Sequence, residues 1–575
     1  MKEETNMKQR FNMHPLAAAT AAALFAATSS AALAQDEAAA EGDIEVVVVT
    51  GSRIEQNIED VAGSISVLSS EDIDAQMVND MSRMFIYEPG VNVTGSNGTA
   101  QNFIVRGMGG DRVMMIKDGM RMNEGYGADG ANDVVGRGFI DVDTIKQVEV
   151  AKGAVSSLYG SDALGGIVAF ATKDAADFLA SRDTHFEVSG LYEGSSETWG
   201  AGALGAFRTG SWETLLSYKY RDGHETQNFT DERQNANIDS NSLLAKTDYV
   251  IDDDQKLTFT VDLFDQDVER PDTGEDHGNY VGLPDWTINE MFTDEEKKNQ
   301  SYSARYRNAD MGLGFMDFLN TNLYYNKTEQ SNEFTMNFET PAPLGPGGSR
   351  DQVRSDLFQQ KTWGLSASAS KELGDNVVNT LSYGFDWDMT ETQRPRNLLE
   401  VNSDGSIRTD QTTAPFPKND TSRLGIYLQD SIEVTERFTL VPGMRYDYYS
   451  MDPQDDPNYD ETLAGDDVPV EKISDSNVSW RLGALYDVTE DMTLYFQYSH
   501  VPPEPPSDLA SCSYHPLSFT GAGIRILPAN ALVPEESDSS EVVLLGAFGD
   551  LSNHLSYFYA DYKNFIQIGY VGSLD

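Results

Sequence analysis

The residues with the clearest potential for chemistry are few and scattered along the 575-residue chain. Cys512 and His515 lie close together, but no third group completes a nucleophile and its base. Neither a Gly-x-Ser-x-Gly elbow nor a His-Glu-x-x-His zinc motif occurs. We therefore expect no enzyme activity and interpret both residues as parts of a polar loop.

Two further segments have the composition of ligand-binding loops. Leu158–Gly166 (LYGSDALGG) is rich in glycine but lacks the Gly-Lys-Ser/Thr of a phosphate-binding loop, so we expect its glycines to allow tight packing. Asp452–Asp460 clusters carboxylates without the regular spacing of a calcium loop, which favours a solvated loop. His224 and His277 lie in polar turns or loops, and His500 ends a strand, where it could face an interior.

The net charge limits the classes of partner that the chain is expected to bind. The chain has 41 basic and 93 acidic residues, hence a formal charge of −52. Nucleic acid is not an expected partner, because phosphate binding needs clustered Lys and Arg. The single Cys512 excludes an intrachain disulfide and a zinc site built on cysteines.

The N-terminus has the organisation of an export signal. Lys8 and Arg10 precede a short apolar run, Leu16–Phe25, and Ala32-Leu33-Ala34 fits a cleavage site, so residues 1–34 are expected to be removed. Either Met1 or Met7 could start the chain. No later segment offers the roughly 18 consecutive apolar residues of a membrane-spanning helix. Any membrane crossing must therefore use strands.

Two regions of the chain must position any functional site: a glycine-rich region near the N-terminus and a long region of alternating residues after it. Gln101–Lys173 contains short apolar runs, Val113–Ile116 and Val148–Val150, joined by glycine-rich turns, which indicates a small mixed domain. Ser69 followed by Glu71 and Asp72 is typical of a capped helix start.

From His185 onward, apolar and polar residues alternate with period two. Leu257, Phe259, Val261 and Leu263 oppose Thr258, Thr260 and Asp262, for example. In Trp212–Tyr220 only Leu215 breaks the polar face. Such strands have one apolar and one polar face, as in a sandwich or a membrane barrel.

Three features favour the barrel. Apolar faces often end in Tyr, Trp or Phe, and the strands run to about ten residues, the length that crosses a bilayer. Three long polar stretches read as loops on one side, namely Asp265–Asn299, Pro341–Gln360 and Asp452–Asp475. Short acidic turns, Asp252-Asp253-Asp254 and Thr489-Glu490-Asp491, alternate with them.

The chain resembles the TonB-dependent outer-membrane receptors. IVRGMGGDRVMMIKDGMR (Ile104–Arg121) and VEVAKGAVSSLYGSDALGGIVAFATK (Val148–Lys173) are similar to the two plug signatures of that family. Arg423–Val434 and Leu440–Tyr449 resemble its recurring barrel segments. Within the signatures the residues singled out are Arg106, Gly107, Arg112, Asp118, Gly119, Arg121, Glu149, Gly153, Tyr159, Gly160, Gly165 and Gly166.

The resemblance also identifies a TonB box. It comprises Ile44, Glu45, Val46, Val47, Val48, Val49 and Thr50, with Gly51-Ser52-Arg53 as its usual continuation. From the residues alone, this β-branched run is equally an ordinary buried strand or an extended segment that pairs with a partner's sheet edge.

The implied fold is an all-β transmembrane barrel, nominally of 22 strands, with an N-terminal α+β plug in its lumen. The implied divisions are residues 1–34 (signal peptide), 35–55 (periplasmic leader with the TonB box), 56–175 (plug) and 183–575 (barrel, with room for roughly 16 to 18 strands and incomplete at its C-terminal end). The implied location is the outer membrane of a Gram-negative bacterium. Its lipid and TonB, with the inner-membrane energy-coupling complex, are the implied partners.

Two features lean toward the haem, haemoglobin and transferrin receptor branch. Ala169–Leu179 resembles the end of the plug in that branch, and Val501–Leu509 and Ala529–Glu535 resemble degenerate forms of two boxes that bracket a haem-ligating histidine. His515 lies between them; Tyr126 replaces the second histidine usual in the plug. Haem, free or from a haem protein, is thus the expected transported ligand, with no intrinsic cofactor. A ferric siderophore is the alternative.

The plug stretch is dense in charge, with Arg106, Asp111, Arg112, Lys117, Asp118 and Arg121. In a polar lumen we expect its basic residues to pair with carboxylates of the barrel wall. We also expect many glycines and few large apolar contacts to give the plug low local stability. A passive porin is the competing class. A signal-relaying receptor is disfavoured, because only Gln35–Asp43 precedes the TonB box after the signal peptide.

Overall fold

The computed structural model places a small N-terminal domain, called the plug below (from residue 63 to 182), before a large sheet, called the wall (from residue 184). The residues it describes are 47–48, 56–57, 63–124, 135–153, 156–160, 163–226, 236–272, 287–340, 348–374, 377–459, 471–502, 513–516, 523–526, 535–548 and 551–565.

The plug is built on a five-stranded sheet of order β3-β8-β9-β6-β7, in which β6 and β9 are parallel and the other pairs antiparallel. Its strands are β3 (Ile65–Ser69), β6 (Val113–Lys117), β7 (Met120–Arg121), β8 (Ile145–Lys152) and β9 (Gly166–Thr172). Two hairpins accompany the sheet: β1 (Val47–Val48) with β2 (Gln56–Asn57), and β4 (Val91–Thr94) with β5 (Asn102–Val105). The strands expected at Val113–Ile116 and Val148–Val150 are confirmed.

The helices of the plug are short. They are α2 (Ser70–Ala75), α3 (Met81–Met84), α4 (Ser156–Tyr159) and α5 (Ala176–Leu179), with 3-10 turns η2 (Gly110–Arg112) and η3 (Val142–Thr144). The expected helix start is confirmed, because Ser69 caps α2 and exchanges hydrogen bonds with Asp72 in a capping box.

The expectation of few large apolar contacts in the plug is wrong. Phe85, Phe103 and Phe170 pack edge to face within a buried cluster that also holds Met81 and Met115. The apolar residues were hard to count in sequence because they come from several short strands and helices separated by turns. The plug therefore has an apolar core of its own.

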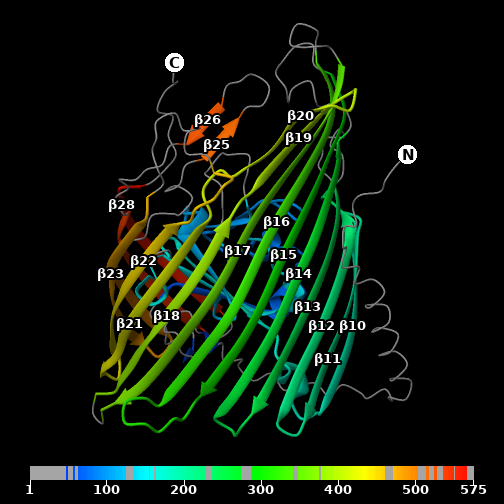
Figure 1. The fold of residues 1–575 in the computed structure, drawn as a ribbon. Helices are drawn as coiled ribbons and strands as arrows, with labels where there is room; N and C mark the ends of the chain where they lie inside the picture. Colours follow the sequence, from blue (N-terminus) through cyan, green and yellow to red (C-terminus); the bar gives the residue numbers. More distant parts are fainter. Residues whose placement is uncertain are drawn as a thin grey trace, which may run out of the picture. The chain divides into compact units, whose positions relative to one another are not determined.

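The wall is a sheet of seventeen strands among the described residues, within the expected range, arranged at a common tilt (Figure 1). They are β10 (Thr184–Glu193), β11 (Thr198–Thr209), β12 (Trp212–His224), β13 (Asn237–Val250), β14 (Gln255–Asp272), β15 (Thr287–Asn308), β16 (Phe318–Thr340), β17 (Gly348–Leu373), β18 (Asn379–Gln393), β19 (Arg396–Asn402), β20 (Ile407–Thr413), β21 (Asn419–Thr435), β22 (Phe438–Pro453), β23 (Ile473–Thr489), β24 (Met492–Val501), β27 (Glu536–Phe548) and β28 (Leu551–Lys563). A separate pair, β25 (Ser513–Pro516) and β26 (Gly523–Ile526), lies between β24 and β27 in sequence.

The two faces of the wall differ as the alternation predicts. On β14, Thr258, Thr260 and Asp262 are buried toward the plug, whereas Phe259 is 46% exposed on the outer face. Leu215, the exception on the polar face of β12, packs with Leu179 of α5 in a small apolar cluster. The outer face also has aromatic residues that pack together, with the ring centroids of Tyr325 and Trp363 4.8 Å apart at a tilt of 47°. This is the arrangement of a barrel whose outer face meets lipid.

The strand lengths and two of the expected loops are wrong. β17 has 26 residues rather than about ten, and most of Asp265–Asn299 and of Pro341–Gln360 is strand. In these two segments most residues on both faces of the strand are polar, so the alternation that marks a strand in sequence disappears while the hydrogen-bonded ladder continues. The acidic turns at Asp252-Asp253-Asp254 and Thr489-Glu490-Asp491 are confirmed.

Among the described residues, no helix is both long enough and apolar enough to span a membrane.

Candidate functional site

The turn between β6 and β7 brings a plug carboxylate against the wall. Asp118 and Gly119 both have positive φ, 49° and 75°, as the tight turn between Lys117 and Met120 requires. This turn directs the Asp118 carbonyl toward the wall, where Arg305 and Asn322 donate hydrogen bonds to it. Lys117, just before the turn, forms a buried ion pair with Asp262 of β14.

The Asp118 carboxylate lies at the centre of a buried network. It accepts hydrogen bonds from the backbone nitrogen of Thr172 at 2.9 Å and from its hydroxyl at 2.6 Å. Lys246 of β13 lies 3.6 Å from Asp118 and 2.9 Å from Asp174. One wall ammonium group therefore joins two carboxylates of the plug.

A second group of wall cations holds η3 of the plug. Arg221 of β12 donates to Asp141 at 2.8 Å and also pairs with Asp143, which lies 3.3 Å from Lys219. Ser242 of β13 donates to Asp141 as well. Together with Lys246, these residues attach the plug to β12 and β13.

Two arginines of the plug attach the plug to the C-terminal part of the wall. Arg106 pairs with Glu541 of β27, with its guanidinium 4.2 Å from the ring centroid of Phe558. Arg112 makes a bidentate pair with Glu535, at 3.0 and 2.6 Å. Bidentate, charge-assisted pairs of this kind are the strong ones in proteins. The expected pairing of plug bases with wall carboxylates is thus confirmed for Arg106, Arg112 and Lys117.

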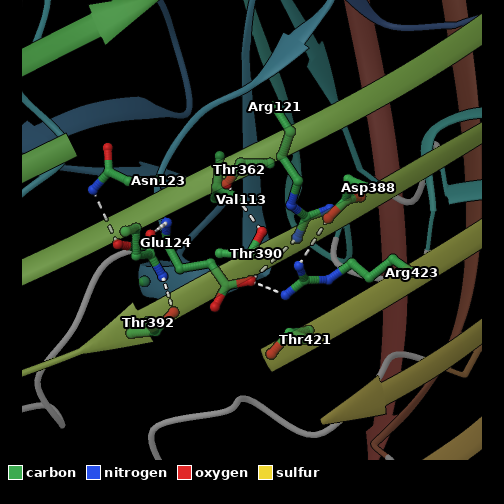
Figure 2. Close-up of polar contacts among 12 residues, drawn as sticks. Val113, Arg121, Asn123, Glu124, Thr362, Asp388, Thr390, Thr392, Thr421 and Arg423 are labelled. Carbon is green, nitrogen blue, oxygen red and sulfur yellow. Dashed lines mark hydrogen bonds and ion pairs between the residues drawn. The ribbon is translucent and has the colours of Figure 1, made fainter. Parts of the chain in front are cut away.

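The end of β7 meets the strands of the wall in a third charged group. Glu124 pairs with Arg423 of β21, and Arg423 lies 3.2 Å from Asp388 of β18. Figure 2 shows Arg121 and Arg423 approaching Glu124 and Asp388 from different strands. Arg121 forms an ion pair with Glu124 of the plug itself, 3.6 Å away, and its charge also acts on Asp388 of the wall. The backbone nitrogen of Glu124 also donates to Gln360 of β17 at 3.2 Å.

Glycines of the second signature leave room for arginine side chains between the plug and the wall. Arg445 of β22 donates to the carbonyl of Leu158 at 2.9 Å, beside Gly160. A side chain at Gly153 would lie 2.8 Å from the Arg106 guanidinium. The backbone itself needs the glycine at Gly166, where a Cβ would lie 2.5 Å from the carbonyl of Ala151. The other signature residues lie as follows: Tyr159 and Gly165 are buried, Glu149 is buried in β8, and Gly107 has a φ of 85° at an open turn.

A cavity of about 310 Å³, lined by both polar and apolar side chains, separates the sheet of the plug from the wall. Both signs of charge line it, with Asp118, Arg121 and Glu149 from the plug. The wall contributes residues of β14 to β18, β21 and β22, among them Arg305, Asn322, Asp386 and Arg445. The plug is thus joined to the wall by several groups of ion pairs and is separated from it where this cavity lies.

The residues expected to bind haem are only partly described. His515 lies on β25, opposite Ile524 of β26. Tyr126, Cys512 and His277 lie outside the described residues, as does most of the TonB box apart from Val47 and Val48. The prediction that His500 could face the interior is wrong. Its ring lies beside Trp480 on the outer face and forms a hydrogen bond of 2.9 Å with Asp538. A one-residue change in strand register reverses the face, which strand ends do not reveal in sequence.

Clustered carboxylates do occur, although not in the segment considered in sequence. In the described part of the chain, Asp265, Asp267 and Glu296 bring carboxylate oxygens within 4.8 Å of one another. In Asp452–Asp460 the described Asp456 accepts hydrogen bonds from backbone nitrogens of Lys418 and Asn458 instead. We attach no metal to either segment.

Acid should loosen the plug. Burial alone would raise the pKa of Asp118, but Lys246, Arg305 and the Thr172 hydrogen bonds lower it from 3.8 to about 2. Arg221 and Lys246 similarly keep the pKa values of Asp141 and Asp174 low against the effect of burial. A lowered pKa stabilises the folded state above the unfolded value, and this contribution is lost as pH falls through the folded one.

We therefore expect the purified protein in a planar bilayer to stay closed from pH 8 to pH 5 and to conduct increasingly from about pH 4 to pH 2. For Asp118 alone the lost contribution is about 2 kcal/mol. Current that rises instead between pH 7 and pH 5 would contradict the assignment to these carboxylates.

The fold and this interface define a class: a β-barrel closed by an N-terminal plug that is held to the wall by ion pairs. Residues 57–167 match the family model described as TonB-dependent receptor plug domain, and residues 231–574 match TonB dependent receptor-like, beta-barrel. The chain belongs to the TonB-dependent receptor family.

Curated relatives include receptors for different iron ligands. The chain is 25% identical to the ferric enterobactin receptor PirA of Pseudomonas aeruginosa, over 95% of this chain and 75% of that protein. It is 25% identical to the rhizobactin receptor of Rhizobium meliloti, over 79% of this chain and 63% of the relative. It is also 25% identical to the hemin receptor of Yersinia pestis, over 77% and 60%. The chain thus spans less than two thirds of the length of the rhizobactin receptor and of the hemin receptor.

Solved structures share the fold. The FrpB iron transporter of Neisseria meningitidis (F3-3 variant) superposes with a TM-score of 0.65 at 18% identity, over 87% of this chain and 74% of that one. A double mutant of the Serratia marcescens hemophore receptor HasR, in complex with HasA and heme, gives 0.66 at 18% identity, over 88% and 74%.

The wall cations were missed by the sequence reasoning. Arg221, Lys246, Arg305, Arg423 and Arg445 each occupy a position on the polar face of an alternating strand. A usable signal existed, because basic residues are outnumbered by acidic ones, 41 to 93. In so acidic a chain, a basic residue on the polar face of a strand indicates that it pairs with a specific acidic side chain.

Proposed function

We propose that this chain is an outer-membrane receptor that imports an iron-bearing ligand with energy delivered through TonB. The observation that carries the proposal is the boundary between plug and wall. Cations and carboxylates on both sides close the passage, and each pair can re-form after it is broken. In this proposal residues 1–34 direct export, and the segment 35–55 presents the TonB box in the periplasm.

The mechanism follows from where force can act. A partner that adds a strand to the TonB box can pull through backbone hydrogen bonds. Because the plug has its own core, the pull first breaks contacts at the boundary with the wall, where the cavity already removes part of the contact. The plug then moves as a unit or unfolds in part, and the passage opens.

For the ligand we propose haem first. His515 is the proposed axial ligand, since imidazole suits haem iron, and Tyr126 is the proposed second ligand. A ferric siderophore is the second candidate, and it is favoured by the relatives named for ferric enterobactin and rhizobactin.

The test uses cells that express the full chain and lack other iron receptors. We expect iron from haem or from the siderophore to accumulate only when TonB is present, while binding at the cell surface is the same with and without it. Accumulation at equal rates in both strains would show a passive pore instead. Haem binding watched by its absorption band, in wild type and His515→Ala, then tests the ligand.

A further inference from the structure

We infer that the turn between β15 and β16 inserts apolar side chains into the periplasmic leaflet of the membrane and anchors the wall there. The inference goes beyond the proposed function, because it concerns neither the transported ligand nor TonB. Residues 311–316 of this turn read Met-Gly-Leu-Gly-Phe-Met. Leu313 is 39% exposed and Phe315 is 62% exposed, so the described residues leave the apolar tip of the turn uncovered.

This apolar tip differs from other turns at the same end of the wall. Charged residues form the turns Asp252-Asp253-Asp254 between β13 and β14, Glu436-Arg437 between β21 and β22, and Glu490-Asp491 between β23 and β24. Short turns of a membrane barrel face the periplasm, and charged ones are suited to water there. β15, β16, β17 and β18 lie side by side in the wall, so their lower ends meet the same layer of the membrane (Figure 1). The sequence of the β15–β16 turn therefore fits a different environment from that of the charged turns.

A hydrogen bond shows which face of the wall the turn covers. The carbonyl of Phe315 accepts a hydrogen bond of 2.6 Å from the hydroxyl of Tyr383 on β18. Because β17 lies between β16 and β18, the turn must cross β17 to reach Tyr383. Tyr383 belongs to the row of β18 that includes the exposed Trp387 and Met389, whereas Ser382 of the alternate row is buried. The turn therefore lies over the outer face of the wall, which meets lipid.

The depth of the turn follows from its position along β17. Trp363 and Leu373 are both exposed on the outer face of this strand, ten residues apart. At about 3.3 Å per residue and a tilt of about 40°, ten residues cross about 25 Å, the height of the apolar band of such barrels. Tyr383 is opposite Ala369, which lies between these two residues and nearer to Leu373. The hydrogen bond to Tyr383 thus holds Phe315 within the periplasmic half of the band.

The turn has a defined structure that presents its tip. Leu313 and Met316 exchange backbone hydrogen bonds of 3.0 and 3.2 Å, which closes a small hairpin around Gly314 and Phe315. At the base of the hairpin, Asp317 accepts a hydrogen bond of 2.5 Å from Lys371 and one of 3.0 Å from the backbone nitrogen of Glu372. The tip is therefore held against β17 and β18, and ordering it for insertion has no further entropic cost.

The partner that this surface fits is phospholipid of the periplasmic leaflet. The tip is continuous with the lipid-facing side chains at the lower ends of the strands, among them the exposed Leu373 and Val434. Interfacial anchors combine Phe and Leu on the lipid side with charged residues at the edge, as Phe315 and Leu313 combine with Asp317 and Lys371 here. In the proposed function the plug is pulled from the periplasmic side, and an anchor in that leaflet resists movement of the wall along with the plug.

The experiment measures the depth of the turn in a bilayer. Cys512 is the only cysteine, so Cys512→Ser gives a background in which one introduced cysteine carries a nitroxide spin label. The label is placed at Phe315→Cys and, as a matched control, at Asp253→Cys in the full-length protein, in vesicles of phosphatidylethanolamine and phosphatidylglycerol. Collisions with oxygen, which concentrates in lipid, are compared with collisions with a water-soluble nickel chelate. We expect the oxygen-to-nickel ratio to be several-fold higher for Phe315→Cys than for Asp253→Cys.

Both other outcomes overturn the inference. Frequent collisions of the Phe315→Cys label with the nickel chelate place the turn in water. Rare collisions with both reagents place it against protein, as in a dimer of this chain. Because the experiment measures no iron uptake, its failure is distinct from a failure of the proposed function.

A second comparison tests the role of the Phe315 side chain. The label is moved to Leu313→Cys, and Phe315 is left intact or replaced. We expect Phe315→Asp to lower the oxygen-to-nickel ratio to that of the Asp253→Cys control, because a carboxylate is excluded from the apolar band. Phe315→Leu should keep the ratio high. A ratio that Phe315→Asp leaves unchanged would overturn the assignment of the anchor to Phe315.

Discussion

Deletion of Ile44–Thr50 is expected to lower iron uptake to the level of cells without TonB, while ligand affinity at the cell surface is unchanged. The run has four consecutive valines, and Val47 and Val48 form the described strand β1. An extended β-branched segment can join the edge of a partner's sheet, and its backbone hydrogen bonds then carry a pull. Without that connection the ion pairs between plug and wall are never broken by force.

The chain offers a control of equal length. Deletion of Glu37–Asp43 removes seven residues of the alanine-rich leader and should leave uptake normal. Val48→Pro keeps the length but removes one backbone donor and should impair uptake strongly. Accumulation of labelled iron in cells and ligand binding to whole cells are measured for all three. Uptake that survives the first deletion would refute the proposed mechanism.

Much of the fold was predictable because each face of a membrane-crossing strand requires one kind of side chain, apolar toward lipid and polar toward the lumen. A residue such as Phe259 meets lipid and its neighbour Thr258 meets the lumen, so period two is preserved wherever a strand crosses the membrane. The turn at Asp118-Gly119 and the arginine positions of the plug were predictable for a similar reason. Each needs one residue type at one place, so sequence alone points to it.

The rest of the site depends on contacts that sequence does not report. Asp118 meets Lys246 across 128 positions of chain, and Arg221 meets Asp141 across 80. The upper part of β17, with Arg350, has mostly polar residues on both faces, so its sequence was expected to form a loop. Only the register of neighbouring strands places Phe338 opposite Arg350.

Replacement of Asp118 by Asn is expected to open the plug. Asn tolerates the positive φ of 49° at this position, so the change removes charge and leaves the backbone conformation intact. Lys246 then keeps only one carboxylate partner, Asp174, in a buried network that has lost half its negative charge. Breaking a buried ion pair from one side costs about 3 kcal/mol. We expect steady ion conductance in a planar bilayer, where wild type stays closed.

Two further substitutions decide whether the charge of Asp118 is the cause of the closure. Asp118→Asn combined with Asp174→Asn and Lys246→Met removes all three charges of this network, and we expect most of the closure to return, since no buried charge is left without a partner. Asp177→Asn applies the same change to a partly exposed plug carboxylate paired with Lys146, where a salt bridge contributes little, and should conduct no more than wild type. If the triple variant conducts as freely as Asp118→Asn alone, the plug is held by packing and hydrogen bonds at this turn. The ion pair would then have no part in closing the passage, and force from TonB would have to disrupt the apolar contacts of the plug directly.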